Sequence, residues 1–193
     1  MPLEQSVSTS HVVTYNGDRE CTSGCGVFAV PVHLATKNGG GMEHNRTEHT
    51  HDLGGLVVAT GVFDLLHIGH LRFLEAARHL GSELVVGIEG DERVRRWKGP
   101  SRPVQSQEDR EAIIAALRVV DRVFVIEGER VDPEYYVELL QPLRPRYLAV
   151  TADDPFLNEK RQAMATIDVE VRVVTPRIEN YSTTHLVALL GLT

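Results

Sequence analysis

Apolar runs alternate with helix-like segments from about residue 53 onward, and this alternation restricts the fold more than any other feature. Short apolar runs that suit buried strands occur at 55–61, 83–90, 122–128, 146–151 and 169–174. Strands that alternate with helices indicate a parallel sheet with right-handed crossovers and helices on both faces. The pattern therefore predicts an α/β fold, a Rossmann-like doubly wound parallel sheet in a single domain.

The helical segments show apolar residues at positions i, i+3, i+4 and i+7, and several have recognisable ends. Helices are expected over 70–81, 106–120, 132–143 and about 155–165, and from about Thr183. Ser106 and Asp109 have the spacing of a capping box, and Pro133 lies near a first helical turn. The basic stretch 91–102 shows no apolar period, and we interpret it as a mobile loop.

Residues 1–52 differ from the rest because they are rich in glycine, polar residues and histidine, without a clear period. We interpret them as a partly flexible extension that adds a strand or serves oligomer contacts, before a domain over 53–193. Cys21 and Cys25 lie here, but their spacing matches no common zinc module. No metal site in the protein is predicted, and a reducing cytoplasm is the expected location.

Composition restricts the partners. The chain has 193 residues and a formal net charge of −7, whereas a protein that grips a long nucleic acid usually presents a basic face. No run approaches the ~18 apolar residues that cross a bilayer, and no secretory signal is apparent at the N-terminus. We therefore expect no nucleic-acid partner and no membrane association, while small anionic substrates remain compatible with the charge.

The segment "ATGVFDLLHIGH" runs from the first predicted strand into the first predicted helix. The backbone amides of Gly61, Val62 and Phe63 and the following helix start form a site that attracts anions. His67 and His70 are three residues apart, so a helical turn places both imidazoles on one side. Two imidazoles directed at a phosphate can donate hydrogen bonds to oxygens that gain charge in a transition state, each worth ~3 kcal/mol.

Three blocks, in order, resemble one family. "TGVFDLLHIGHLRFLEAARHLG", "RRWKGPSRPVQSQEDREAIIAAL" and "RIENYSTT" are similar to the motifs of the cytidylyltransferase-like nucleotidyltransferases. Small members of that family include glycerol-3-phosphate and ethanolamine-phosphate cytidylyltransferases and the adenylyltransferase that makes ADP-heptose. Class I tRNA synthetases share the HIGH tetrapeptide, but they need a much longer chain, a second lysine-rich signature and an anticodon-binding region.

The resemblance implies roles for individual residues. His67 and His70 would stabilise the transition state and leaving group, and Lys98 would neutralise the transferred phosphate. The family's nucleotide contacts correspond to Gly61, Val62, Phe63, His67, Gly69, His70, Lys98, Arg177, Glu179, Asn180, Ser182 and Thr183. Its acceptor contacts correspond to Asp64, Arg110 and Asp153, with Asp64 orienting His67 or touching the acceptor.

Local alternatives stay open for several of these residues. The basic cluster around Lys98 also suits a solvated surface, and Arg110 also suits a charge on a helix surface. Ser182 or Thr183 also suits the N-cap of the last helix. Asp153 and Asp154 suit either a sugar or polyol hydroxyl or the cap of the following helix.

The function predicted from these blocks is nucleotidyl transfer from an NTP to a small phosphorylated alcohol or sugar, with release of pyrophosphate. The arginine of "RIENYSTT" favours CTP, whereas "KGPSRPV" favours ATP and a heptose 1-phosphate; CTP is slightly preferred. The alternative of another class is a regulatory protein that binds the nucleotide without turnover. Mg²⁺ is expected to arrive with the NTP, and the resemblance implies a homodimer.

Overall fold

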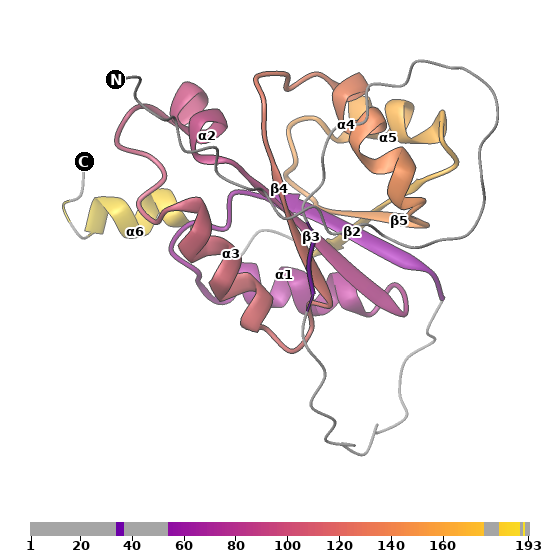
Figure 1. Ribbon diagram of the computed structural model, residues 1–193, viewed down its shortest axis with the longest axis horizontal. Coiled ribbons are helices and arrows are strands. Elements are labelled where there is room, and N and C mark those ends of the chain that lie inside the picture. Colours follow the sequence, from indigo (N-terminus) through magenta and orange to yellow (C-terminus); the bar gives the residue numbers. More distant parts are fainter. Residues whose placement is uncertain (1–33, 37–53, 176–181, 190, 192–193) are drawn as a thin grey trace, which may run out of the picture.

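The computed structural model describes residues 34–36, 54–175, 182–189 and 191, which form a sheet covered by helices (Figure 1). The strands are β1 (Leu34–Thr36), β2 (Leu56–Gly61), β3 (Glu83–Glu89), β4 (Arg122–Ile126), β5 (Tyr147–Thr151) and β6 (Glu170–Thr175). The α-helices are α1 (Ile68–Arg78), α2 (Asp91–Lys98), α3 (Gln107–Ala116), α4 (Pro133–Leu140), α5 (Leu157–Ala165) and α6 (Thr183–Leu189). A short 3-10 helix, η1 (Gln141–Leu143), follows α4.

The sheet has the strand order β1-β4-β3-β2-β5-β6. Strands β2 to β6 pair in parallel, and β1 pairs antiparallel with β4 at the edge. The predicted Rossmann-like parallel sheet is confirmed. Part of residues 1–52 adds a strand, which is one of the two roles expected for them, while the boundary at residue 53 stays a prediction.

Alternate residues of the central strands point to opposite faces of the sheet and build two cores. On β2, Val57 and Ala59 pack in the core beneath α1 and α3, whereas Val58 packs in the core beneath α4 and α5. In Figure 1 these two pairs of helices lie on opposite sides of the sheet. Burial of each large apolar side chain contributes roughly 1.5–3 kcal/mol, which explains the apolar runs in the sequence.

The starts of two predicted helices are confirmed by their caps, although α3 ends at Ala116 and α4 at Leu140, earlier than expected. The hydroxyl of Ser106 accepts from the backbone N–H of Asp109 at 3.1 Å at the start of α3. At the start of α4, the Asp132 carboxylate accepts from the N–H of Tyr135 at 2.9 Å, with Pro133 in the first turn.

One expectation about the backbone is wrong: the basic stretch after β3 is helix α2 and not a loop up to Lys98. The helix has no apolar period because Val94 is its one buried apolar residue. Its charges instead follow the helix dipole, with Asp91 and Glu92 in the first turn and basic residues in the last. The sequence signal for α2 was therefore the order of charges.

Candidate active site

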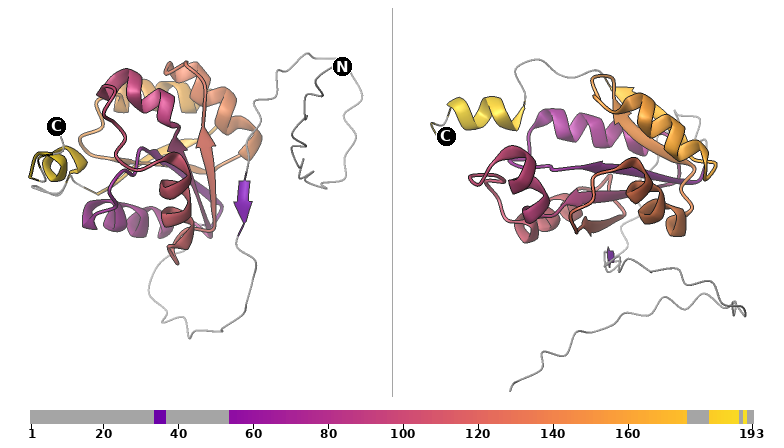
Figure 2. Two further views of the ribbon diagram at one scale, coloured as in Figure 1. Left: turned by 60° about the vertical axis from the view of Figure 1, so that its left-hand side comes forward. Right: turned by 90° about the horizontal axis from the view of Figure 1, so that it is seen from above.

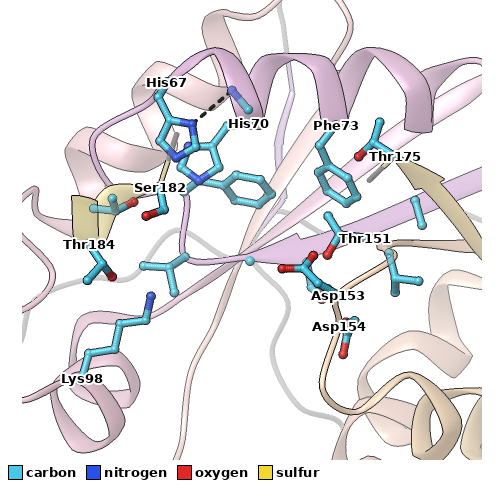
Figure 3. A pocket seen from close by; sticks show the side chains of 18 of the residues that line it. His67, His70, Phe73, Lys98, Thr151, Asp153, Asp154, Thr175, Ser182 and Thr184 are labelled. Atoms are coloured by element: carbon cyan, nitrogen blue, oxygen red, sulfur yellow. Dashed lines mark hydrogen bonds between the residues drawn. The ribbon is translucent and has the colours of Figure 1, made fainter. Parts of the chain in front are cut away.

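A pocket of about 320 Å³ opens at the carboxyl ends of β2 and β5 (Figure 3). Strand order reverses at β2, since β3 and β4 follow on one side and β5 and β6 on the other. Parallel α/β sheets bind ligands at such switch points. The pocket is lined by Thr60, Gly61, Val62, Phe63, His67, Gly69, His70, Phe73, Lys98, Ala149, Val150, Thr151, Asp153, Asp154, Lys160, Thr175, Ser182, Thr183 and Thr184.

The turn between β2 and α1 is strained. Phe63 and Leu65 have φ angles of 51° and 47°, a left-handed region that bulky side chains rarely adopt and that costs on the order of 1–3 kcal/mol for each. Contacts from α3 and the loop before it hold the turn. Arg110 Nη1 donates to the carbonyl of Val62 at 2.7 Å, and the N–H of Leu65 donates to the side-chain oxygen of Gln105 at 2.8 Å.

His67 is the N-cap of α1. Its Nδ1 accepts a hydrogen bond from the backbone N–H of Gly69 at 3.1 Å. A ring nitrogen that accepts carries no proton, so the neutral imidazole has its proton on Nε2 and can donate from there. Burial lowers the pKa of His67 and favours this neutral form.

His70 lies against His67 in the pocket wall. The two rings stack with centroids 3.7 Å apart, and Phe63 meets the His70 ring edge-on at 5.4 Å. Burial, followed by electrostatic interaction with His67 and Lys98, lowers the pKa of His70 to about 3, while Asp64 acts in the opposite direction. The ring is neutral near pH 7, and its buried Nδ1 has no hydrogen-bond partner among the described residues. The pair can therefore offer neutral N–H donors to a phosphate without mutual charge repulsion.

Lys98 is the last residue of α2 and extends toward the pocket from the side opposite the histidines (Figure 3). Gly99 follows with a φ of 94°, which turns the chain sharply after the lysine. Burial, with a further contribution from the charge of Arg102, lowers the pKa of Lys98, while Asp64 acts in the opposite direction. An ammonium that has lost part of its hydration can interact strongly with a phosphate oxygen.

Asp64 does not have the partners that we expected. Its side chain is fully buried, and its oxygens accept from the Arg102 guanidinium and from the backbone N–H groups of Val104 and Gln105. Burial acts to raise the pKa of Asp64, but these hydrogen bonds outweigh it and hold the pKa below its usual value. The carboxylate therefore holds the loop after α2, and none of these hydrogen bonds comes from His67.

Arg110 was also expected at the substrate, and the structure corrects this. The side chain is fully buried, which also excludes a charge on the helix surface. Its guanidinium donates to the carbonyls of Val62 and Glu89 at 2.7 and 2.9 Å and to the Asp91 carboxylate at 2.6 Å. Arg110 thus supports the ends of β2 and β3 behind the pocket.

The C-terminal motif reaches the pocket through the start of α6. Ser182 Oγ accepts from the N–H of His185 at 3.1 Å, so it caps the helix, as the local alternative proposed. Thr183 Oγ1 donates to the backbone carbonyl of Asp64 at 2.7 Å. Thr184, which we did not single out, is exposed and lines the pocket. The expected contacts at Arg177, Glu179 and Asn180 lie outside the described residues.

The opposite end of the pocket is polar as well. Asp154 Oδ1 accepts from the N–H of Phe156 at 2.9 Å, and its Oδ2 accepts from Lys160 Nζ at 2.6 Å. Of the two roles considered for Asp154, the contacts support the structural one, because its carboxylate holds the start of α5. Asp153 is exposed and lies at the pocket beside Thr151 (Figure 3).

Residues 58–188 match the profile of the cytidylyltransferase-like family, more than half of the chain. The chain belongs to the cytidylyltransferase-like family. The resemblance carried by the three sequence blocks is thereby confirmed.

Among its relatives in this family are proteins named bifunctional protein HldE. The HldE of Syntrophotalea carbinolica is 44% identical over 98 residues, which are 51% of this chain and 19% of that protein. The HldE of Magnetococcus marinus is 47% identical over 104 residues, which are 53% of this chain and 20% of that protein. The chain thus spans about a fifth of the length of these curated relatives.

A solved structure of similar fold is the lipopolysaccharide core biosynthesis protein from Thermoplasma volcanium. It has a TM-score of 0.55 and 29% sequence identity, and the match covers 65% of this chain and all of that chain. This likeness covers the whole of that chain, in contrast to the HldE matches.

The family motifs meet at one site, although some residues differ from expectation. The structure brings together His67, His70, Lys98, Ser182 and Thr183 around the pocket, with Asp153 at its other end. It places the carboxylate of Asp64 and the guanidinium of Arg110 behind the wall. Sequence reasoning missed several residues of the lining, of which only Phe73 belonged to a helical periodic pattern: Thr60, Phe73, Ala149, Val150, Thr151, Lys160, Thr175 and Thr184.

Expectations about metals and membranes were also compared with the structure. Within the described ranges, no three or more His, Cys, Asp or Glu side chains are grouped so as to hold a metal ion. The same ranges contain no helix of the length and apolar character needed to cross a bilayer. Arrival of Mg²⁺ with the nucleotide stays a prediction.

Proposed function

We propose that this chain transfers AMP from ATP to a sugar 1-phosphate and releases pyrophosphate, with a heptose 1-phosphate as the first candidate acceptor. The observation that carries the proposal is the convergence of His67, His70 and Lys98 on one pocket at the switch point of a cytidylyltransferase-like chain. Two neutral imidazoles and one cation suit a group that carries negative charge before, during and after the reaction.

The reaction proceeds by direct displacement. A phosphate oxygen of the acceptor attacks the α-phosphorus in line, a new P–O bond forms, and the bond to the bridging oxygen of the β-phosphate breaks. Pyrophosphate leaves with that electron pair, and no base is required because the attacking oxygen is already ionised. The N–H groups of His67 and His70 donate to oxygens that gain charge, and Lys98 offsets the charge of the transferred phosphate.

The comparisons favour ATP over the slightly preferred CTP. The likeness to the HldE relatives, at 44–47% identity over about half of this chain, supports the ADP-heptose-forming alternative. The block "KGPSRPV", which contains Lys98, already resembled the ADP-heptose type. The arginine of "RIENYSTT" remains the sequence argument for CTP.

A sugar acceptor agrees with the polar end of the pocket. Asp153 lies there with the hydroxyls of Thr151 and Thr175, and carboxylate and hydroxyl oxygens suit sugar hydroxyls (Figure 3). The lipopolysaccharide core biosynthesis protein of similar fold supports a sugar of that kind. Binding of the acceptor by Asp153 is therefore part of the proposal.

The remaining parts of the proposal follow from the family. Mg²⁺ would be held mainly by the phosphates of ATP, and it would supply positive charge that offsets theirs. The protein acts as a homodimer in the cytoplasm, on soluble substrates. Light scattering of the purified chain, which gives the mass in solution, tests the dimer.

Pyrophosphate release, measured with each of the four NTPs and a panel of sugar 1-phosphates and polyol phosphates, tests the function. We expect release only when ATP and a sugar 1-phosphate are both present, and the ADP-sugar is then identified by mass spectrometry. Release with CTP and glycerol 3-phosphate would support the cytidylyltransferase alternative. Tight NTP binding without release for any acceptor would support a regulatory nucleotide-binding protein.

A further inference from the structure

We propose that Arg102 is a positioning residue that aims Lys98 at the transferred phosphate by neutralising Asp64. This inference rests on the proposed function of the pocket, since it assigns a part in that site to a residue outside it. Arg102 follows α2 in the loop that leads to α3. The family resemblance implied no role for it, and it does not line the pocket.

The side chain of Arg102 is committed to one buried partner. It is 7% exposed, and its Nε and Nη2 donate to the same oxygen of Asp64 at 3.2 and 2.6 Å. Two of the three guanidinium nitrogens are therefore committed to a charge-assisted pair within the protein. Asp64 is fully buried, and without the pair a carboxylate would remain in the wall of the site.

The backbone joins Arg102 to Lys98 through a closed turn. The N–H of Arg102 donates to the carbonyl of Gly99 at 3.1 Å, and the N–H of Gly99 donates to the carbonyl of Arg95 at 3.0 Å. Gly99 adopts a φ of 94°, so the chain reverses directly after Lys98. Anchoring Arg102 to Asp64 therefore also fixes the end of α2 from which Lys98 extends.

The charges of Asp64 and Arg102 also connect Arg102 to Lys98. Asp64 favours the protonated form of Lys98 and Arg102 opposes it, so both groups act on the ammonium electrostatically. With Arg102 removed, the buried carboxylate of Asp64 would be left to attract the ammonium of Lys98. Lys98 would then pair with Asp64 inside the protein, and its positive charge would no longer be available to the transferred phosphate.

A double-mutant cycle between Arg102 and Lys98 tests the inference. The variants Arg102→Met and Arg102→Lys are made in the wild-type chain and in Lys98→Ala. The equilibrium dissociation constant of MgATP is measured by calorimetry, together with kcat and KM for ATP. If Arg102 acts through Lys98, its substitution lowers affinity and kcat/KM about 10-fold or more in the wild-type chain and less than about 3-fold in Lys98→Ala. Losses that are equal in both backgrounds would overturn the inference.

Arg93 provides the matched control. It is also buried, and it pairs with a buried carboxylate, Glu89; it belongs to the same helix as Lys98 but lies outside the pocket lining. Arg93→Met should lower Tm, and any loss of kcat/KM should be the same with and without Lys98. Should Arg102→Met fail to fold, the pair Asp64→Asn with Arg102→Met removes both charges, and Arg102→Lys retains the charge without the two-nitrogen contact.

Failure of the inference and of the proposed function have different signatures. A wild-type chain that binds MgATP but releases no pyrophosphate would refute the transfer reaction, and the cycle on dissociation constants would still decide the role of Arg102. Turnover with additive losses would refute the inference alone. A wild-type chain that does not bind MgATP would overturn both.

Discussion

Thr183 donates a hydrogen bond from its hydroxyl to the backbone carbonyl of Asp64 at 2.7 Å, although the two residues are 119 positions apart. Both views of Figure 2 show α6 at the periphery of the domain, apart from the layers that cover the sheet. This buried contact therefore ties the C-terminal motif to the strained turn before α1. Through its carboxylate, Asp64 also holds Arg102, so the three sequence blocks of the family meet at one residue.

The first prediction concerns this contact. Thr183→Val retains the shape of the side chain but leaves the buried carbonyl of Asp64 without this donor, at a cost of about 1–3 kcal/mol. We expect the free energy of unfolding to fall by that amount and KM for ATP to rise. Thr183→Ser should restore both, and Thr166→Val, which removes an exposed hydroxyl bond to Ala163, is the control for chemical denaturation. Equal behaviour of Thr183→Val and the wild type would contradict the role of the contact.

Lys98 carries the second prediction. Lys98→Ala removes the cation that faces the histidines, and kcat is expected to fall about 100- to 1,000-fold, the usual effect of losing one transition-state donor. Tm should change little, because the substitution removes a charge that burial already disfavours. Arg95→Ala, on the exposed side of the same helix, removes a charge without reaching the pocket. If Arg95→Ala and Lys98→Ala reduce kcat equally in a pyrophosphate-release assay, Lys98 has no special role.

The third prediction is a pH dependence of stability that comes from His70. Its pKa is about 3 in the folded chain, below the 6.5 of a free imidazole. Between these values the unfolded state binds more protons, so stability falls as the pH drops from about 6.5 toward 3. Between pH 7.5 and pH 4 the free energy of unfolding of the wild type should fall through this residue by on the order of 3 kcal/mol. In His70→Asn the fall should be smaller by that amount.

Urea denaturation at each pH measures this effect. His79→Asn removes another imidazole at the end of α1 and serves as the control, because His79 is exposed and outside the pocket. In His79→Asn the free energy of unfolding should depend on pH as it does in the wild type. A His70→Asn slope that follows the wild type would show that burial does not suppress the charge of His70.

Much of the fold could be predicted because its signals are local. The apolar strands, the cap at Ser106 and Pro133 follow rules that operate within a few residues. Helix α2 escaped because Val94 is its one buried apolar residue, and burial of Arg93 depends on Glu89 from β3. A buried arginine looks like a surface residue until its partner is known.

The site was predicted where residue type fixes chemistry and was missed where a neighbour decides it. Two polar imidazoles contribute little to an apolar core, so the spacing of His67 and His70 predicted a functional site. Asp64 and Arg110 are charged residues next to the same motifs, yet each is buried and paired with another charged residue of the protein, Arg102 and Asp91. Lys160 lies at the pocket, where it donates a hydrogen bond to Asp154. No periodic pattern in the sequence predicts this contact.

Asp153 carries the fourth prediction. It lies at the end of the pocket opposite Lys98 (Figure 3), so in the proposed reaction its carboxylate contacts the sugar. Asp153→Asn is expected to raise KM for the acceptor about 10-fold or more, because hydrogen bonds to a charged group are typically worth about 1.5–3 kcal/mol. KM for ATP should stay within about 2-fold of the wild type. Glu159→Gln, an exposed carboxylate on α5, is the control. A rise in KM for ATP alone would assign Asp153 to the nucleotide.

Arg110 allows the structural and chemical contributions to be separated. Arg110→Met leaves the partly buried Asp91 carboxylate and the carbonyls of Val62 and Glu89 without this donor, so the free energy of unfolding should fall by about 2–5 kcal/mol. The same guanidinium supports the carbonyl of Val62 in the strained turn. Its loss should therefore let Phe63 relax toward an ordinary φ angle and reduce kcat, even at a temperature where the variant is fully folded. Arg118→Ala, an exposed arginine just after the same helix, should change stability by less than about 0.5 kcal/mol and leave kcat intact. A folded Arg110→Met variant with wild-type kcat would show that the turn keeps its catalytic geometry without this support.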